Sequence, residues 1–389
     1  MDLLEQRSLV TAVCEHVREH LDLPNVLDNR TGRRQLADYV HVCLNRLAPL
    51  LDHRSREWVH RRAMAELEGL GVLGLYLEDP TVTEVAVNDG GEVWVDRDGR
   101  MGHVDTLGPG ELELLIERIL APLGLRFDLT SPIVSARLAN GQRMCAVLAP
   151  LAVNGTCLSI RRFALQHVVI DAFTTAAVAQ LMHHLVARRC NIVVSGATST
   201  GKTTFLNALT GSVAHHERLI TIEDTAELNL LAPHVVRLES RPATPDGVEA
   251  VSVRQLLHAA LRLRPDRLVI GEVRGPEAYD MVQALNTGHD GSLSTVHANS
   301  PGDALRRIAS LAALGAPGQS PESLEEQVRS SIDVIVHLTR LADGSRAVST
   351  VEEVGAPTSE RWSTVLLAAD GKVVGTPTRL REPAAGAER

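Results

Sequence analysis

The residues best suited to chemistry in this sequence form a loop at positions 196–204, which reads GATSTGKTT. It fits the pattern G-x-x-x-x-G-K-[ST] with Gly196, Gly201, Lys202 and Thr203. The glycines let backbone N–H groups turn inward around phosphate oxygens, and a helix starting at Thr203 adds its positive end. Lys202 would bridge the β- and γ-phosphates, and Thr203 would supply an oxygen ligand to Mg²⁺.

The loop therefore predicts a site for a nucleoside triphosphate and Mg²⁺. Lys202 supports this, because only it and Lys372 are lysines among 39 basic residues. The guanine-recognition pattern N-K-x-D is absent, which favours ATP over GTP. The predicted nucleotide-binding residues are Gly196, Ala197, Thr198, Ser199, Thr200, Gly201, Lys202, Thr203 and Thr204.

Carboxylates at the ends of two further predicted strands could complete a hydrolytic site. Residues 267–274 read RLVIGEVR, so an apolar strand ends in Gly271 and Glu272. A carboxylate at that end can position or deprotonate an attacking water, although a surface carboxylate is the alternative. Gly271 stands where many P-loop proteins have a metal-binding aspartate. Glu223 and Asp224 end another predicted strand beside the nucleotide.

The elements that must position these residues alternate between strand and helix. A helix is predicted at 171–187 and the strand before the loop at 191–195. Further strands are predicted at 218–223, 234–239, 267–271 and 292–297, and helices at 203–210, 249–263, 276–287 and 301–314. Such alternation predicts an α/β domain with a mainly parallel sheet and helices on both faces.

The N-terminal part of the chain has a different pattern. Apolar positions at helical spacing predict a helical region over 1–68, and Gly69–Gly74 is interpreted as a glycine-rich break. Alternating strands around Asn88-Asp89-Gly90-Gly91 predict a hairpin, which opens a small α+β domain. The predicted domains are 1–68 (helical), 70–165 (α+β), 166–345 (P-loop ATPase) and 346–389 (a partly loose C-terminal extension).

The amino-acid composition disfavours several classes of function. The formal charge of −9 and an aromatic content of 3% disfavour a nucleic-acid coat or a stacking platform for single strands. The five cysteines contain no CxxC pair, so no zinc ribbon can be built from sequence neighbours. No apolar run is long enough for a membrane span, and no secretory signal is seen at the start. A cytoplasmic protein is expected.

Three longer stretches resemble the secretion-type ATPases of type II and type IV secretion and pilus assembly. They are 131–163, with several arginines, 218–230 (RLITIEDTAELNL), and 264–299, which contains RLVIGEVR and ends in STVHAN. Residues 79–88 are similar to the opening hairpin of the family. The resemblance covers about 70–340 and is greatest to the CpaF branch, which powers Tad/Flp pilus assembly.

The resemblance implies a RecA-like ATPase domain behind a smaller PAS-like domain, in a homohexamer that works with inner-membrane platform proteins. It implies that the acidic cluster of Glu223, Asp224 and Glu227 organises Mg²⁺ and its waters, although Glu227 could be a solvated surface charge. The predicted metal ligands are Thr203, Glu223, Asp224 and Glu272, some through water. His297 would sense the γ-phosphate, with His289 less suited. Relatives in the type II branch can carry a tetracysteine zinc module, which is absent here, so no structural zinc is expected.

The resemblance also implies that arginines of the N-terminal domain reach the γ-phosphate when that domain closes through the 163–171 linker. The alternative is that they are ordinary surface arginines. The chain has serine at Ser135, where relatives commonly have aspartate. The arginines concerned are Arg137, Arg143, Arg161 and Arg162.

The sequence thus predicts a Mg²⁺-dependent ATPase motor for pilus assembly or protein secretion, with Glu272 and Lys202 as central catalytic residues. Two alternatives stay open. One is a RecA-like motor that moves nucleic acid, including conjugative DNA transfer. The other is an ATP-binding regulator without hydrolysis, which an intact Glu272 disfavours.

Overall fold

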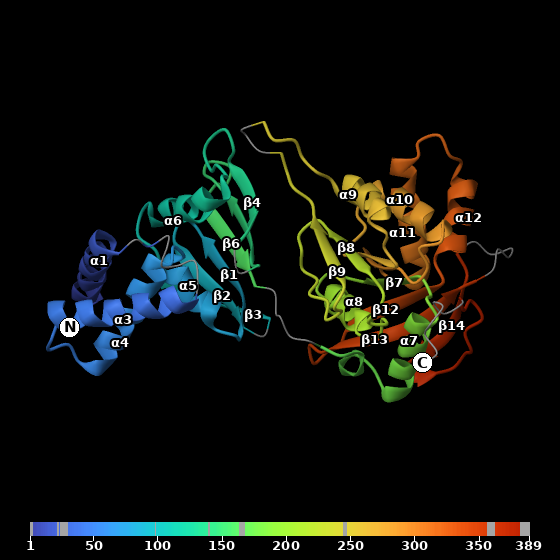
Figure 1. The fold of residues 1–389 in the computed structure, drawn as a ribbon, viewed down its shortest axis with the longest axis horizontal. Helices are drawn as coiled ribbons and strands as arrows, with labels where there is room; N and C mark the ends of the chain where they lie inside the picture. Colours follow the sequence, from blue (N-terminus) through green and yellow to red (C-terminus); the bar gives the residue numbers. More distant parts are fainter. Residues whose placement is uncertain are drawn as a thin grey trace. The chain divides into compact units, whose positions relative to one another are not determined.

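The computed structural model of the chain describes residues 3–21, 23, 30–97, 99–138, 141–162, 168–243, 247–355 and 362–381. The chain divides into two compact units, residues 1–164 and 165–389, and Figure 1 labels most of their helices and strands. Most of the predicted 163–171 linker, residues 163–167, lies outside the described residues.

The first unit begins with the predicted helices. They are α1 (Leu3–His20), α3 (Arg30–Leu47) and α4 (His53–Leu67). Their shared core contains Val13, Val17, Val40 and Leu44, at the helical spacing seen in the sequence. This region is therefore a small helical bundle with its own core.

The predicted glycine-rich break at Gly69–Gly74 is wrong over most of its length, because α5 (Gly71–Glu78) begins inside it. The glycines serve close packing instead. A Cβ at Gly71 would lie 2.6 Å from Leu115 Cδ1, and one at Gly74 would lie 3.3 Å from Leu70 Cβ. Gly71 also has φ +52°, a conformation that glycine adopts most easily.

The α+β part of this unit is a six-stranded antiparallel sheet in the order β3-β2-β1-β6-β5-β4. Helices α5 and α6 (Glu111–Leu120) pack on it through a core that contains Leu73, Ile116, Met144 and Ile160. The predicted hairpin is confirmed. The strands are β1 (Val82–Asn88), β2 (Glu92–Arg97), β3 (Arg100–Thr106), β4 (Ile133–Arg137), β5 (Arg143–Val147) and β6 (Cys157–Arg161).

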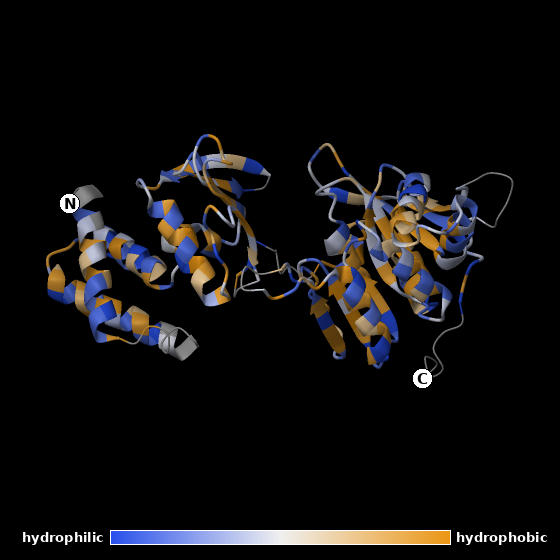
Figure 2. Ribbon diagram, turned by 90° about the horizontal axis from the view of Figure 1, so that it is seen from above, coloured by the Kyte–Doolittle hydropathy of each residue, from blue (hydrophilic) through white to orange (hydrophobic). Residues whose placement is uncertain are grey.

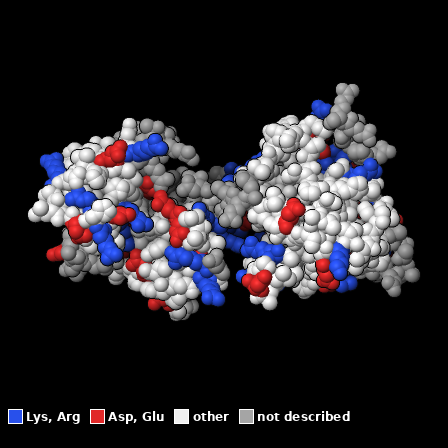
Figure 3. Space-filling view, turned by 90° about the horizontal axis from the view of Figure 1, so that it is seen from below, with Lys and Arg blue, Asp and Glu red and all other residues white. Residues whose placement is uncertain are grey.

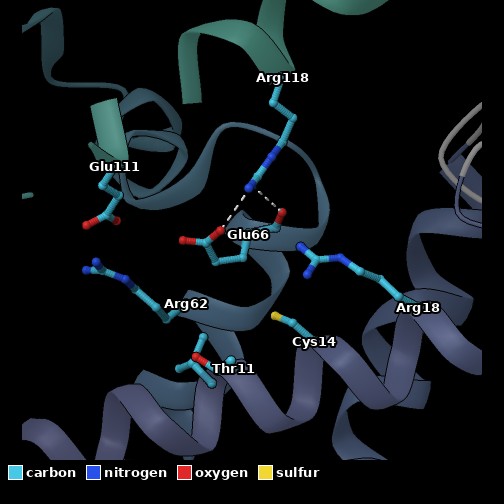
Figure 4. Close-up of a pocket in the computed structure, with 8 residues that line it drawn as sticks. Thr11, Cys14, Arg18, Arg62, Glu66, Glu111 and Arg118 are labelled. Atoms are coloured by element: carbon cyan, nitrogen blue, oxygen red, sulfur yellow. Dashed lines mark hydrogen bonds and ion pairs between the residues drawn. The ribbon is translucent and has the colours of Figure 1, made fainter. Parts of the chain in front are cut away.

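Ion pairs join the helical bundle to this sheet, so the two form one unit. Arg62 of α4 lies 3.1 Å from the Asp105 carboxylate of β3, and Arg118 of α6 lies 3.1 Å from Glu66 of α4. Arg62, Glu66 and Arg118 border a cavity of about 290 Å³ between α1, α4 and α6 (Figure 4). On the face drawn in Figure 3, acidic and basic side chains of this unit are interspersed.

The second unit is built on a nine-stranded sheet in the order β15-β14-β13-β12-β7-β11-β10-β8-β9. The strands from β12 to β9 pair in parallel, as the sequence predicts, and β13–β15 extend the sheet antiparallel. The parallel strands are β7 (Ile192–Gly196), β8 (Leu219–Glu223), β9 (Val235–Glu239), β10 (Arg267–Ile270), β11 (Leu293–His297) and β12 (Val334–Arg340).

Helices cover both faces of this sheet. One core holds α7 (Ala176–Ala187) and α8 (Lys202–Thr210) on one face. A second core holds the helices of the other face, and Figure 2 shows the hydrophobic segments along the central strands. Those helices are α9 (Val253–Ala260), α10 (Glu277–Asn286), α11 (Pro301–Gly315) and α12 (Pro321–Ser331).

The predicted C-terminal extension from residue 346 is corrected by the structure. β13 (Arg346–Val354), β14 (Thr364–Ala369) and β15 (Lys372–Val373) belong to the same sheet as the P-loop strand. Buried carboxylates also hold the segment after β15. Glu353 accepts hydrogen bonds from the Thr378 and Arg379 backbone N–H groups, at 2.7 and 2.6 Å.

None of the helices in the described part of the chain is long and apolar enough to cross a membrane.

A buried ion pair at the start of β10 gives a first testable prediction. Arg267 is 1% exposed and donates to both carboxylate oxygens of Glu217, at 2.7 and 2.8 Å. Burial acts to raise the pKa of Glu217, but Arg267 and Arg189 outweigh it and lower that pKa. Glu217→Gln should therefore lower the free energy of unfolding by about 3–5 kcal/mol, because it leaves a buried guanidinium without its counter-charge.

Urea unfolding of the full chain measures this change. Arg306→Ala is the matched control, because it removes an exposed ion pair to Asp303 and should change stability little. Equal effects of the two substitutions would contradict the assignment of Glu217 as a buried structural anchor.

Candidate nucleotide site

The loop between β7 and α8 has the backbone geometry that its glycines predict. Gly196 and Gly201 have φ +153° and +87°. A Cβ at Gly196 would lie 2.6 Å from Leu338 O, and one at Gly201 would lie 2.8 Å from Arg346 Cδ. Gly196 therefore needs glycine for space as well as for conformation, whereas Gly201 needs it for its conformation. Thr203 is half-buried in the first turn of α8.

The ammonium group of Lys202 is folded against this loop. Lys202 is 6% exposed, and its Nζ donates to Gly196 O at 3.0 Å and to Ala197 O at 2.7 Å. Burial lowers the pKa of Lys202, and the Glu272 carboxylate opposes that effect. A triphosphate would replace these neutral carbonyl acceptors with charged oxygens, which accept stronger hydrogen bonds.

Lys202, His297 and Glu272 form a chain of polar contacts at the edge of the sheet. Lys202 Nζ lies 3.1 Å from His297 Nδ1, and His297 Nε2 lies 2.8 Å from Glu272 Oε1. An ammonium group can only donate, so Nδ1 accepts and the proton of the neutral imidazole sits on Nε2, the ring nitrogen next to Glu272. Burial lowers the pKa of His297, which favours this neutral form. The predicted placement of His297 on the same sheet edge as Glu272 is confirmed.

Arg274 is a neighbour of Glu272 that sequence analysis did not single out. Its guanidinium donates to Glu272 Oε2, and this bond raises the pKa of Arg274. The side chain of Arg274 is 56% exposed, whereas that of Glu272 is 19% exposed. Its position two residues after Glu272 was the signal from which the sequence could have identified it. Arg274 therefore holds the second oxygen of the carboxylate while the first faces His297.

The two acidic residues after β8 have different surroundings. Glu223 is 3% exposed, and its Oε1 accepts from the backbone N–H groups of Glu227 and Leu228 at 2.8 and 2.9 Å. Its Oε2 has no hydrogen-bond partner among the described residues. Burial raises the pKa of Glu223 to about 7. Asp224 is exposed and accepts from Ser240 Oγ at 2.7 Å.

Packing explains the glycine that replaces the usual aspartate at the end of β10. A Cβ at Gly271 would lie 2.9 Å from Glu223 Cγ. The Glu223 side chain thus lies in the space that a side chain at position 271 would take. Thr295 Oγ1 donates to Gly271 O at 2.7 Å and fixes this strand end from the other side.

Other histidines near the site differ in their contacts. His289 Nδ1 lies 3.1 Å from Ala284 O, in the turn after α10. His337 of β12, which sequence analysis missed, lies with Nδ1 2.9 Å from Ser195 Oγ, directly before the loop. Burial lowers the pKa of His337.

The structure separates the four predicted arginines into two groups. Arg137 pairs with Arg143 across β4–β5, and Arg143 pairs with Arg161 across β5–β6. Residues paired in this way share one face of a sheet, so these three form a row, with Glu84 opposite Arg161 on the next strand. Arg162 lies beyond the end of β6 and donates to Asp79 O, which is a structural contact.

The family model described as "Type II/IV secretion system protein" matches residues 66–370. This chain belongs to that family. A putative conjugal transfer protein of Mycobacterium tuberculosis is 39% identical over 305 residues, which are 75% of this chain and 86% of that protein. Conjugal transfer protein TrbB of Rhizobium radiobacter is 33% identical over 301 residues, 74% and 89% of the two chains.

A solved structure shows the same fold. The pilus retraction motor PilT with bound ADP aligns with a TM-score of 0.58 and 19% identity, over 74% of this chain and 83% of that one. The predicted α/β architecture is thereby confirmed.

The raised pKa of Glu223 gives a second prediction. A carboxyl group with a folded-state pKa of about 7 and an ordinary value of 4.5 is most compatible with folding when protonated. Its contribution to stability is complete below about pH 4.5 and is lost as the pH rises through 7. Glu223→Gln mimics the protonated form, so it should be more stable than wild type by about 3 kcal/mol at pH 8, and this difference should shrink as the pH falls to 5.

Thermal unfolding of the full chain at pH 5, 6.5 and 8, with EDTA and without nucleotide, measures this difference. Glu227→Gln is the control at a half-buried neighbour. A constant difference between Glu223→Gln and wild type at all three pH values would show that the Glu223 carboxyl does not titrate in this range.

Proposed function

We propose that this protein is a Mg²⁺-dependent ATPase that works as a cytoplasmic, ring-forming motor in a membrane secretion or pilus system. The observation that supports it most is the contact chain from Lys202 through His297 to Glu272. It links the residue that would hold the β- and γ-phosphates to the residue that would hold the attacking water.

In the proposed reaction, water attacks the γ-phosphorus and the bond to the β–γ bridging oxygen breaks, which gives ADP and phosphate. Glu272 orients the water and accepts its proton, since one of its oxygens faces His297 and the other is held by Arg274. Lys202 stabilises the charge that develops on the phosphates. His297 reports the γ-phosphate to Glu272, because it contacts both Lys202 and Glu272.

The residues present fit a divalent cation. The buried Glu223 Oε2 lacks a hydrogen-bond partner among the described residues, and a cation or its water would satisfy that oxygen. We propose that Thr203, Glu223, Asp224 and Glu272 hold Mg²⁺, some through water. When bound, Mg²⁺ neutralises charge on the β- and γ-phosphates.

The arginine row is proposed as the third part of the site. Like charges on directly opposed strands are unfavourable, and an anion lying across them would relieve that cost. Arg137, Arg143 and Arg161 therefore suit a γ-phosphate brought to them by closure of the units or by a neighbouring copy. Arg162 does not join this proposal, because it is bound to Asp79 O.

The pathway is open between two candidates. The sequence stretches of the arginine segment and the Glu223 and His297 segments favour the CpaF branch, and so assembly of a Tad/Flp pilus with inner-membrane platform proteins. The names of the relatives at 39% and 33% identity favour conjugal transfer. Turnover that DNA stimulates in a salt-sensitive manner would select the second candidate.

Substitutions at the two ends of the contact chain test the chemistry. Lys202→Ala should abolish nucleotide binding, because it removes the charge that holds the phosphates. Glu272→Gln should still bind ATP but lower its turnover by about a hundredfold or more. Phosphate release and nucleotide binding are measured for both, with Arg100→Ala on the exposed edge strand β3 as control. Normal turnover of Glu272→Gln would remove this residue from its role.

A site that is shared between copies of the chain gives a separate prediction. If arginines from another copy complete the site, phosphate release per chain should rise with protein concentration over a hundredfold range. Arg161→Ala should lower turnover at every concentration by about tenfold or more, with ATP binding kept. Sizing chromatography at each concentration shows whether a constant turnover comes from a stable ring. Constant turnover of a monomer would contradict a site shared between copies.

A further inference from the structure

A histidine and glutamate cluster near the end of α1 lies outside the nucleotide site. Residues 16–20 read HVREH, so His16, Glu19 and His20 stand at positions i, i+3 and i+4 of the helix. Side chains at this spacing share one helix face. One ligand atom from each of the three lies within 4.8 Å of the other two.

Two contacts orient the rings. His20 Nδ1 lies 2.8 Å from His16 O, and a carbonyl can only accept, so Nδ1 carries the proton and Nε2 keeps its lone pair. Such a bond to a backbone carbonyl is the usual partner of a metal-binding histidine. The His16 ring stacks on Tyr39 of α3, with 6.5 Å between centroids and 3° between planes. These contacts restrict the two imidazole rings, so the rings lose less conformational entropy when a ligand binds.

We propose that His16, Glu19 and His20 form a binding site for Zn²⁺. Two imidazoles and one carboxylate are the ligand types that Zn²⁺ takes at sites with three protein ligands, which leave a fourth position for water. Imidazole ligands disfavour Mg²⁺, so this site differs in chemistry from the nucleotide site. It also differs from a cysteine-based zinc module, because Cys14 and Cys43 are buried in the core of the bundle.

Titration of the full-length protein with Zn²⁺ alone, in excess Mg²⁺ and without nucleotide, tests this site by calorimetry. One Zn²⁺ per chain is expected. His16→Ala and His20→Ala should each weaken binding by about tenfold or more, and Glu19→Gln should weaken it less. All three positions are exposed or half-buried, and circular dichroism checks that the helices persist.

His41→Ala with His60→Ala is the matched control, because these rings approach within 6.4 Å in the same unit without belonging to the cluster. Lys202→Ala should bind Zn²⁺ as wild type does, so loss of the proposed ATPase activity and loss of this site are distinguishable. The proposal is overturned if the protein binds no Zn²⁺, or if the His16 and His20 variants bind it as tightly as the control.

Discussion

The candidate site depends on the parallel pairing of β7 with β11 and of β11 with β10. In this register Gly196 lies opposite His297, and Ile270 lies opposite Ser294. Parallel strands end at the same edge, so the P-loop, His297 and Glu272 emerge together. A slip of one residue would turn His297 to the other face of the sheet. The apolar residues that fix the register, such as Val194 and Val269, therefore position the polar ones.

Much of this arrangement could be predicted from the sequence because the strands of the second unit are short apolar runs that end in polar residues. Lys202, Glu223, Glu272 and His297 each follow or end such a run, and strand ends in an alternating α/β pattern meet at one edge. The long stretches that resemble secretion-type ATPases also indicated the family. The position of the strand ends and the family resemblance can both be read without knowing how side chains pack, so the sequence was enough to predict them.

What the sequence could not predict depends on packing between distant segments. The glycines near residue 70 predict a break, yet Gly71 begins α5 and leaves the space that Leu115 fills. The strand at residues 346–354 could not be predicted because this segment mixes charged and apolar side chains. It extends the sheet by pairing with β12. The pKa of Glu223 is raised by burial, which only the fold reveals. Only the fold likewise shows that Arg162, unlike Arg161, is bound to Asp79 O.

The distribution of charge between the two units bears on how hydrolysis would be coupled to movement. The P-loop unit holds one lysine against carbonyl oxygens and one carboxylate between a histidine and an arginine, so its charges are largely paired internally. The arginine row places like charges side by side in the other unit. A triphosphate would need more positive charge than the first supplies, and the row would gain from an anion. Under the proposed function, a bound triphosphate would therefore attract an arginine row, from this chain or from a neighbouring copy, and release of phosphate would weaken that attraction.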